Sequence, residues 1–136
     1  MTEVTMFNRR HAIAALAGSV ALLAAFGASA LDKAAFSQTA FDAAIKAGSP
    51  VLIDVSAPWC PTCKAQAPIL SELTKQPRFK NLVVFNVDFD SQKDALRGLK
   101  AQQQSTLIVF KGGAEMGRSV GDTNKASIEA LLARAI

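Results

Sequence analysis

After residue 31, short apolar runs typical of strands alternate along the chain with segments whose apolar residues have helical spacing. Three short apolar runs with β-branched residues are typical of buried strands: 51–55, 82–87 and 106–111. Four segments have apolar residues at helical spacing and are predicted to be helices: 36–47, 60–75, 91–100 and 123–135. Gly112 and Gly113 predict a hairpin turn into a fourth strand at 114–120.

The order of these elements predicts the fold class. Strand, helix, strand, helix, hairpin and closing helix indicate an α/β fold, with a mixed central sheet and helices on both faces. Right-handed crossovers make the 51–55 and 82–87 strands parallel neighbours, and the hairpin adds antiparallel pairs. Ser91 is the expected N-cap of the third helix, and Pro68 is expected to kink the second.

The first thirty residues have the pattern of a targeting segment. Arg9 and Arg10 precede an uncharged apolar run that ends in Ala28-Ser29-Ala30. A charged start, an apolar middle and small residues at the exit are the three parts of a secretory signal. We therefore expect 1–30 to be a signal peptide, and 31–136 to be one domain located in the periplasm.

Two alternatives for the leader remain open. A retained membrane anchor is one, because the apolar run is about as long as the minimum for a span, although Ala and Gly insert weakly. Membrane contact would then come only through the leader. The adjacent Arg9 and Arg10 also allow a twin-arginine export signal.

Composition and charge exclude several classes of protein. The chain is 50% hydrophobic and 19% charged, which argues against a disordered chain. Its formal charge is +4, and removal of the leader leaves 13 basic and 10 acidic residues, a net charge of +3. These charges form no basic stripe, so we expect no nucleic-acid partner. A monomer is a separate expectation.

The two cysteines, Cys60 and Cys63, both lie beyond the leader, and the only histidine, His11, lies within it. Cysteines three positions apart close too small a loop to stabilise a domain strongly. A structural zinc site takes four ligands, usually Cys and His, so no metal is expected here. We therefore interpret the pair as redox-active, with a structural or metal-holding pair as the alternative.

Their position between a strand and a helix predicts reactivity. With Cys60 as N-cap, Pro61 occupies the first helical position, where it fits. Free backbone N–H groups and the helix dipole then favour the thiolate form of Cys60. Cys60 is expected to be exposed and to attack. Cys63 is expected to be shielded and to resolve the mixed disulfide.

Asp54, Trp59 and Lys64 are further candidates near the pair. Asp54 is a carboxyl group within an apolar strand, where burial would favour its protonated form and suit proton exchange with Cys63, directly or through water. The alternative is an edge carboxylate facing solvent. Trp59, the only Trp, would cover the disulfide and offer an aromatic surface to substrates, or simply pack. Lys64 is either a stabiliser of the thiolate or a solvated side chain.

These motifs resemble the thioredoxin family over essentially all of 31–136. The segment from Asp54 to Lys64, with the motif Trp-Cys-Pro-Thr-Cys, resembles the active-site strand, turn and helix start of that family. Further segments are similar to the kinked helix, the central strand and the C-terminal hairpin with its following glycine: 67–70, 86–88, 106–113 and 120–121.

The resemblance implies a thioredoxin-like fold and a disulfide oxidoreductase. Cys60 would be the nucleophile, Cys63 the resolving cysteine and Asp54 the buried acid. The redox-active disulfide would serve in place of a cofactor. The partners would be disulfide-containing protein substrates and a redox protein that recharges the pair. The expected substrate-binding residues are Trp59, Pro61, Thr62, Ser105 and Thr106.

Two departures from the family affect this interpretation. The dipeptide between the cysteines is Pro61-Thr62, and without an adjacent histidine we expect a moderate reductant. Ser105 stands where the family has a cis-proline, so either the Gln104-Ser105 bond is a strained cis bond or the loop is trans and reshaped. Ser105 would also leave room for a metal on the two sulfurs, a reading that we disfavour.

Two other functions remain alternatives to a disulfide reductase. One is an oxidase or isomerase with the same fold. The other is a non-catalytic binding or assembly module whose cysteine pair is structural or holds a metal.

Overall fold

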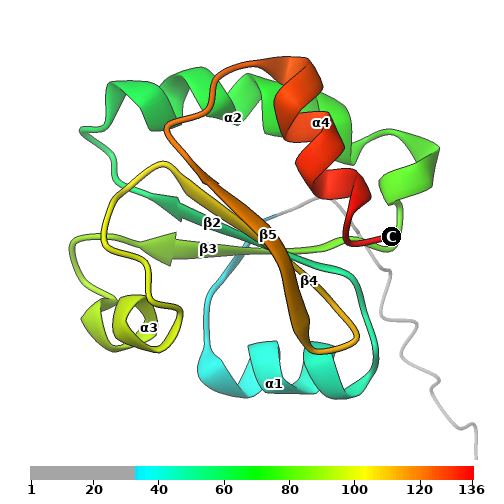
Figure 1. Cartoon of the computed structure of the whole chain (residues 1–136). Coiled ribbons are helices and arrows are strands. Elements are labelled where there is room, and N and C mark those ends of the chain that lie inside the picture. The colour runs from blue at the N-terminus through cyan, green and yellow to red at the C-terminus, as the bar shows by residue number, and fades with distance from the viewer. Residues whose placement is uncertain (1–32) are drawn as a thin grey trace, which may run out of the picture.

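The computed structural model describes residues 33–136, which form a five-stranded sheet flanked by helices (Figure 1). The strands, in sheet order β1-β3-β2-β4-β5, are β1 Ala34–Ala35, β3 Val83–Asp88, β2 Val51–Ser56, β4 Thr106–Lys111 and β5 Ala114–Val120. The helices are α1 Gln38–Lys46, α2 Pro61–Thr74, α3 Lys93–Gly98 and α4 Lys125–Ala133, with a 3-10 turn η1 at Pro77–Phe79.

The strand pairing confirms the predicted mixed sheet. β2 and β3 run parallel, with Val51 opposite Val83 and Ser56 opposite Asp88. β2 pairs antiparallel with β4, and β4 with β5 through the Gly112-Gly113 turn. β2 is therefore the central strand, and its carboxyl end, from which the chain enters α2, lies between the end of β3 and the start of β4.

Helices cover both faces of the sheet, as Figure 1 shows: α2 and α4 lie on one face, and α1 and α3 on the other. The alternating side chains of β2 supply both cores. Leu52 packs with Leu73 of α2 and Leu132 of α4, whereas Ile53 belongs to the cluster with Phe36 and Leu96. Asp54 shares the face of Leu52, so it points toward the layer of α2 and α4.

Two details differ from the prediction. β1 was not predicted, because two alanines carry no strand signal; they pair in parallel with Phe85 and Asn86. The prediction of Ser91 as a helix N-cap is wrong, because its hydroxyl donates instead to Asp88 Oδ1 at 2.9 Å. α3 begins at Lys93, and its N-cap residue Gln92 makes no side-chain cap bond.

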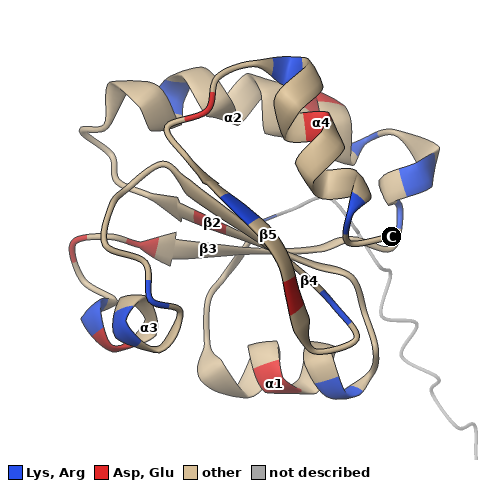
Figure 2. Ribbon diagram, in the orientation of Figure 1, with Lys and Arg blue, Asp and Glu red and all other residues tan. Residues whose placement is uncertain are grey.

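Charges on the described residues are of mixed sign. Figure 2 shows that each of the four helices carries both basic and acidic residues. Within 33–136, no helix has the length and apolar character needed to cross a membrane. The expected signal peptide at 1–30, with its alternatives, lies outside the described residues.

Candidate active site

Cys60 caps the N-terminus of α2 through its sulfur. Its extended backbone (φ −82°, ψ 112°) precedes Pro61, the first residue of the helix, and its Sγ accepts a hydrogen bond of 3.1 Å from the backbone N–H of Cys63. The Cα atoms of Cys60 and Cys63 are 5.3 Å apart, and the two sulfurs form a disulfide. The predicted N-cap position is therefore observed, with sulfur as the acceptor.

The expected exposure of Cys60 is wrong. Cys60 is only 1% exposed and Cys63 is 8% exposed. Ala57 and the ring of Phe89 pack against the pair, and the Ser105 hydroxyl contacts both sulfurs. A place at a helix tip does not reveal which loops fold over it, and this is why the sequence suggested an open sulfur.

Ser105 lies in a reshaped, trans loop. All peptide bonds in 33–136 are trans, and Ser105 has a positive φ of 61°. Its N–H donates to the Val55 carbonyl at 2.8 Å, and its carbonyl accepts from the N–H of Gly121 at 3.0 Å. Of the two alternatives for this loop, the second is therefore observed. Its hydroxyl lies 3.1 Å from Cys60 Sγ and 3.1 Å from Cys63 Sγ.

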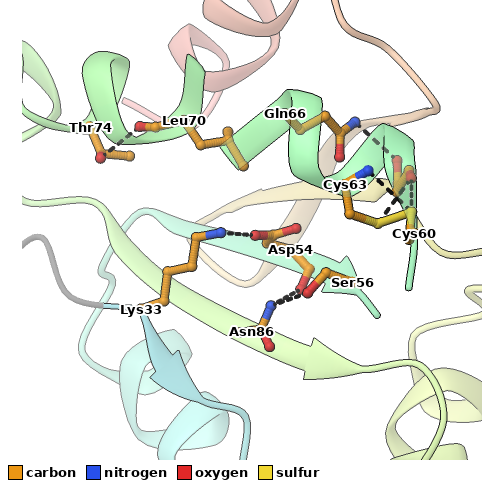
Figure 3. Close-up of polar contacts among 10 residues, drawn as sticks. Lys33, Asp54, Ser56, Cys60, Cys63, Gln66, Leu70, Thr74 and Asn86 are labelled. Carbon is orange, nitrogen blue, oxygen red and sulfur yellow. Dashed lines mark hydrogen bonds and ion pairs between the residues drawn. A yellow bond between two sulfur atoms is a disulfide. The ribbon is translucent and has the colours of Figure 1, made fainter. Parts of the chain in front are cut away.

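Gln66 is a buried polar residue that sequence reasoning missed. It lies one turn after Cys63 on the buried side of α2 and is 1% exposed (Figure 3). Its Nε2 donates to the Asp122 carbonyl at 2.8 Å and to the Ser105 carbonyl at 3.3 Å. Gln66 thus ties α2 to the two loops beside the sulfurs. A polar residue three positions after Cys63, on a helix with apolar buried neighbours, was the available signal.

Asp54 is buried in the central strand, at 2% exposure, and is paired with a lysine. Lys33 Nζ lies 2.5 Å from Asp54 Oδ2, as Figure 3 shows. The alternative of an edge carboxylate facing solvent is therefore wrong. Within the described chain, the carboxylate makes no hydrogen bond to either sulfur. Proton exchange between Asp54 and Cys63 stays a prediction.

Lys33 was also missed, because it precedes a strand too short to be predicted. Its ammonium group supplies the compensating charge that a buried carboxylate needs.

The expected substrate-binding residues differ in exposure. Trp59 is 54% exposed, and its Nε1–H donates to Asp90 Oδ2 at 2.9 Å, with its ring edge-on to Phe89. Pro61 is exposed and Thr62 is half-buried. Thr106 is buried, and its hydroxyl donates to the Gln103 carbonyl at 2.7 Å. Of these side chains, Trp59 offers the large apolar surface beside the disulfide; their binding roles stay predictions.

The remaining candidate residues add little to the site. Lys64 is exposed on α2, and its role at the thiolate stays a prediction. No cluster of three or more His, Cys, Asp or Glu side chains suited to a metal occurs in residues 33–136.

This arrangement is suited to reversible disulfide exchange. Cys60 Sγ accepts a hydrogen bond from a backbone N–H and lies at the positive end of the α2 dipole. The hydrogen bond and the dipole both favour the thiolate when the pair is reduced. Cys63 lies three residues further along, and the Cα–Cα distance of 5.3 Å is within the ordinary range for a disulfide.

Comparison with known proteins agrees with this geometry. The family model described as Thioredoxin matches residues 32–134. Thioredoxin of Mycobacterium tuberculosis is 36% identical over 84 residues, which cover 62% of this chain and 72% of that protein. Thioredoxin of Echinococcus granulosus is 36% identical over 93 residues, covering 68% and 84% of the two chains. The crystal structure of Trxlp from Edwardsiella tarda has a TM-score of 0.73 and 44% identity, covering 74% of this chain and 98% of that one.

Proposed function

The chain belongs to the thioredoxin family of disulfide oxidoreductases, and we propose that it works after export, reducing or exchanging disulfides of partner proteins. Cys60 is the nucleophile of this proposal and Cys63 the resolving cysteine. The observation that carries it is the hydrogen bond from the Cys63 N–H to Cys60 Sγ at the start of α2.

The exchange takes place in two steps. The Cys60 thiolate attacks one sulfur of a partner disulfide, forms a mixed disulfide and releases the second partner sulfur as a thiolate. Cys63 then passes its proton to the released partner thiolate, directly or through water. Its own thiolate attacks Cys60 Sγ, which forms the Cys60–Cys63 bond and releases the first partner sulfur. The protein loses two electrons, the partner disulfide gains them, and the released thiolates take up protons. Reduction by a second redox partner restores the dithiol.

Export is supported by the sequence of residues 1–30. Arg9 and Arg10, the apolar run and the small residues at 28–30 follow the order of a secretory signal. Disulfides form and persist in proteins of the periplasm, so a dithiol enzyme has protein substrates there. We therefore place the mature enzyme in the periplasm.

A trapping experiment tests the proposed nucleophile and resolving cysteine. Cys63→Ala should accumulate mixed disulfides between Cys60 and partner proteins, which dithiothreitol releases. Cys60→Ala is the matched control, because it keeps one cysteine and the same fold but should trap far fewer partners. Wild type should reduce insulin disulfides in the presence of dithiothreitol, and neither variant should do so at a comparable rate.

Two results would reject this function. Equal trapping by both variants would remove the assigned roles, and a thiol pair that never cycles would favour the binding module. The reduction potential measured against glutathione decides between a reductase and an oxidase, since about 30 mV is a tenfold change in equilibrium constant. We expect a moderately reducing value, because no histidine lies between Cys60 and Cys63.

A further inference from the structure

Ser105 holds an unusual position against the disulfide. Its Oγ lies at the same distance, 3.1 Å, from Cys60 Sγ and from Cys63 Sγ. The residue is 3% exposed, so water has little access to the hydroxyl. Within residues 33–136, no other side-chain hydroxyl or amide makes a hydrogen bond to these sulfurs.

The backbone of Ser105 is held in a strained conformation. A φ of 61° is uncommon for any residue other than glycine, and such outliers persist when the surroundings fix them and often mark functional sites. Three hydrogen bonds hold this backbone. The Ser105 N–H donates to the Val55 carbonyl, and the Ser105 carbonyl accepts from the Gly121 N–H and from Gln66 Nε2. They aim the side chain at the sulfurs.

The chemistry of a hydroxyl suits this place. It carries one proton that rotation directs to either neighbour, and a thiolate is a far stronger acceptor than a disulfide sulfur. In a buried site with little water, a single donor of this kind has a large effect on which sulfur carries charge.

We propose that Ser105 is a catalytic residue, whose hydroxyl donates a hydrogen bond to the negatively charged sulfur of the pair, first Cys60 and then Cys63. The inference rests on the exchange chemistry of the proposed function and is independent of export.

The hydroxyl keeps its proton throughout the exchange. In the reduced enzyme it donates to the Cys60 thiolate. Once Cys60 is bonded to the partner sulfur, Cys63 passes its proton to the released partner thiolate, and the hydroxyl turns to the Cys63 thiolate. Cys63 then attacks Cys60 Sγ, the partner thiolate leaves, and the hydroxyl returns to the position between two neutral sulfurs. In the reverse direction it stabilises Cys63 as the leaving thiolate when an external thiol opens the disulfide.

Gln66 is the positioning residue for this hydroxyl. Its Nε2 bonds the carbonyls of Ser105 and Asp122, which fixes the loop with respect to α2. It acts through the backbone of Ser105 and does not itself touch the reacting sulfurs through a hydrogen bond.

The test measures the pKa of Cys60 in full-length protein that carries Cys63→Ala, from the ultraviolet absorbance of the thiolate. Ser105→Ala and Ser105→Gly both remove the hydroxyl, and glycine also relieves the positive φ. Both should raise the pKa by about one unit, a tenfold loss of thiolate at a pH below it.

A matched control removes a buried hydroxyl elsewhere. Ser119 Oγ on β5 is buried and has no hydrogen-bond partner among the described residues, so Ser119→Ala should leave the pKa unchanged. The charged groups on the elements around the pair are the same in all variants: Asp54, Lys64, Asp90, Lys93 and Asp122. Any common shift in the alanine and glycine variants therefore reports the hydroxyl.

A second measurement follows the resolving step with both cysteines present. At a pH below the pKa of Cys63, the Ser105→Ala variant should release the partner from its mixed disulfide about threefold more slowly than wild type. The fraction of Cys63 present as thiolate falls tenfold, and the higher nucleophilicity of the more basic thiolate partly offsets this loss. An unchanged Cys60 pKa in both Ser105→Ala and Ser105→Gly, with folding verified by urea titration, would overturn the proposal. Failure of the wild-type protein to reduce insulin would instead reject the proposed function. The measured shift in the Cys60 pKa does not depend on insulin reduction, so the two outcomes are distinguishable.

Discussion

At the scale of single residues, the site has one buried polar contact and one that is partly buried. Ser105 contacts the sulfurs, and Lys33 neutralises Asp54. The second contact joins a partly exposed ammonium group to a carboxylate that is almost fully buried, with side-chain exposures of 36% and 3%. Removal of only one partner leaves an uncompensated charge, which is the costly case for such pairs.

Lys33→Met should therefore destabilise the protein by about 2 kcal/mol, less than for a fully buried pair because the lysine is partly solvated. The measurement is urea unfolding at neutral pH. The double variant Lys33→Met with Asp54→Asn removes both charges and should recover most of that loss. Equal stability of wild type and Lys33→Met would show that the contact contributes nothing.

Trp59 supplies the exposed aromatic surface next to the pair. Trp59→Ala should lower kcat/KM for a protein disulfide about tenfold, because the substrate loses an apolar contact with the ring. A tenfold loss corresponds to about 1.4 kcal/mol. Reduction of the Cys60–Cys63 disulfide by dithiothreitol should change much less, because a small thiol does not need this surface. An equal loss with both reductions would point to damage of the site instead of lost binding.

Sequence reasoning located the residues of the site but not their surroundings. Cys60, Cys63 and Asp54 were identified because a strand-to-helix junction and a charge in an apolar strand are local signals. The burial of Cys60, the contact from Lys33 and the role of Gln66 in the loops depend on segments distant in sequence, from 33 to 122. No local pattern reports such contacts.

At the scale of elements, prediction was most accurate where the apolar pattern is long and turns are marked. The bounds of β4 and β5 agree with the predicted strands, because Gly112 and Gly113 mark the turn between them. α3 is shorter than predicted, and Ser91 lies instead in the preceding turn, where its N–H and hydroxyl donate to Asp88. β1 has only two residues, and its position depends on pairing with β3.

The turn before α3 has a pH-sensitive anchor. Asp88 Oδ1 accepts from the N–H and hydroxyl of Ser91 and from the N–H of Asp90. These hydrogen bonds lower the pKa of Asp88 below its usual value of 3.8, and the bond from the Ser91 N–H has the largest effect. A carboxyl group with a lowered pKa stabilises the folded state above its usual pKa, and this contribution is lost as the pH falls through the folded value.

Asp88→Ala should lower the urea midpoint at pH values well above 3.8, and its difference from wild type should shrink as the pH falls below that value. Asp94→Ala is the control, because that side chain is 93% exposed and its ion pair with Arg97 is a surface pair that contributes little to stability. A constant difference between Asp88→Ala and wild type across the whole range would contradict this assignment.

At the scale of the whole molecule, the described domain and the first thirty residues have separate roles in the proposal. The sheet and its four helices hold the cysteine pair at the end of β2, whereas residues 1–30 would direct the chain across a membrane. The fold class was predictable from element order alone, because few topologies satisfy right-handed crossovers between parallel strands.

Expression of the full chain in a bacterial host should give a periplasmic protein whose N-terminus is Leu31, as read by N-terminal sequencing. Replacement of Arg9 and Arg10 by lysine should block export through the twin-arginine route and leave general export intact. A full-length, membrane-bound product would indicate a retained anchor, and a product left inside the cytoplasm would reject export.

The central claim is that the start of α2 makes Cys60 an easily ionised nucleophile. Its most direct test is the titration of the Cys60 thiolate in the Cys63→Ala protein with Ser105 intact. We expect a pKa below about 7.5, in the range of cysteines at helix N-termini. A value near about 8.5, that of a free cysteine, would contradict it.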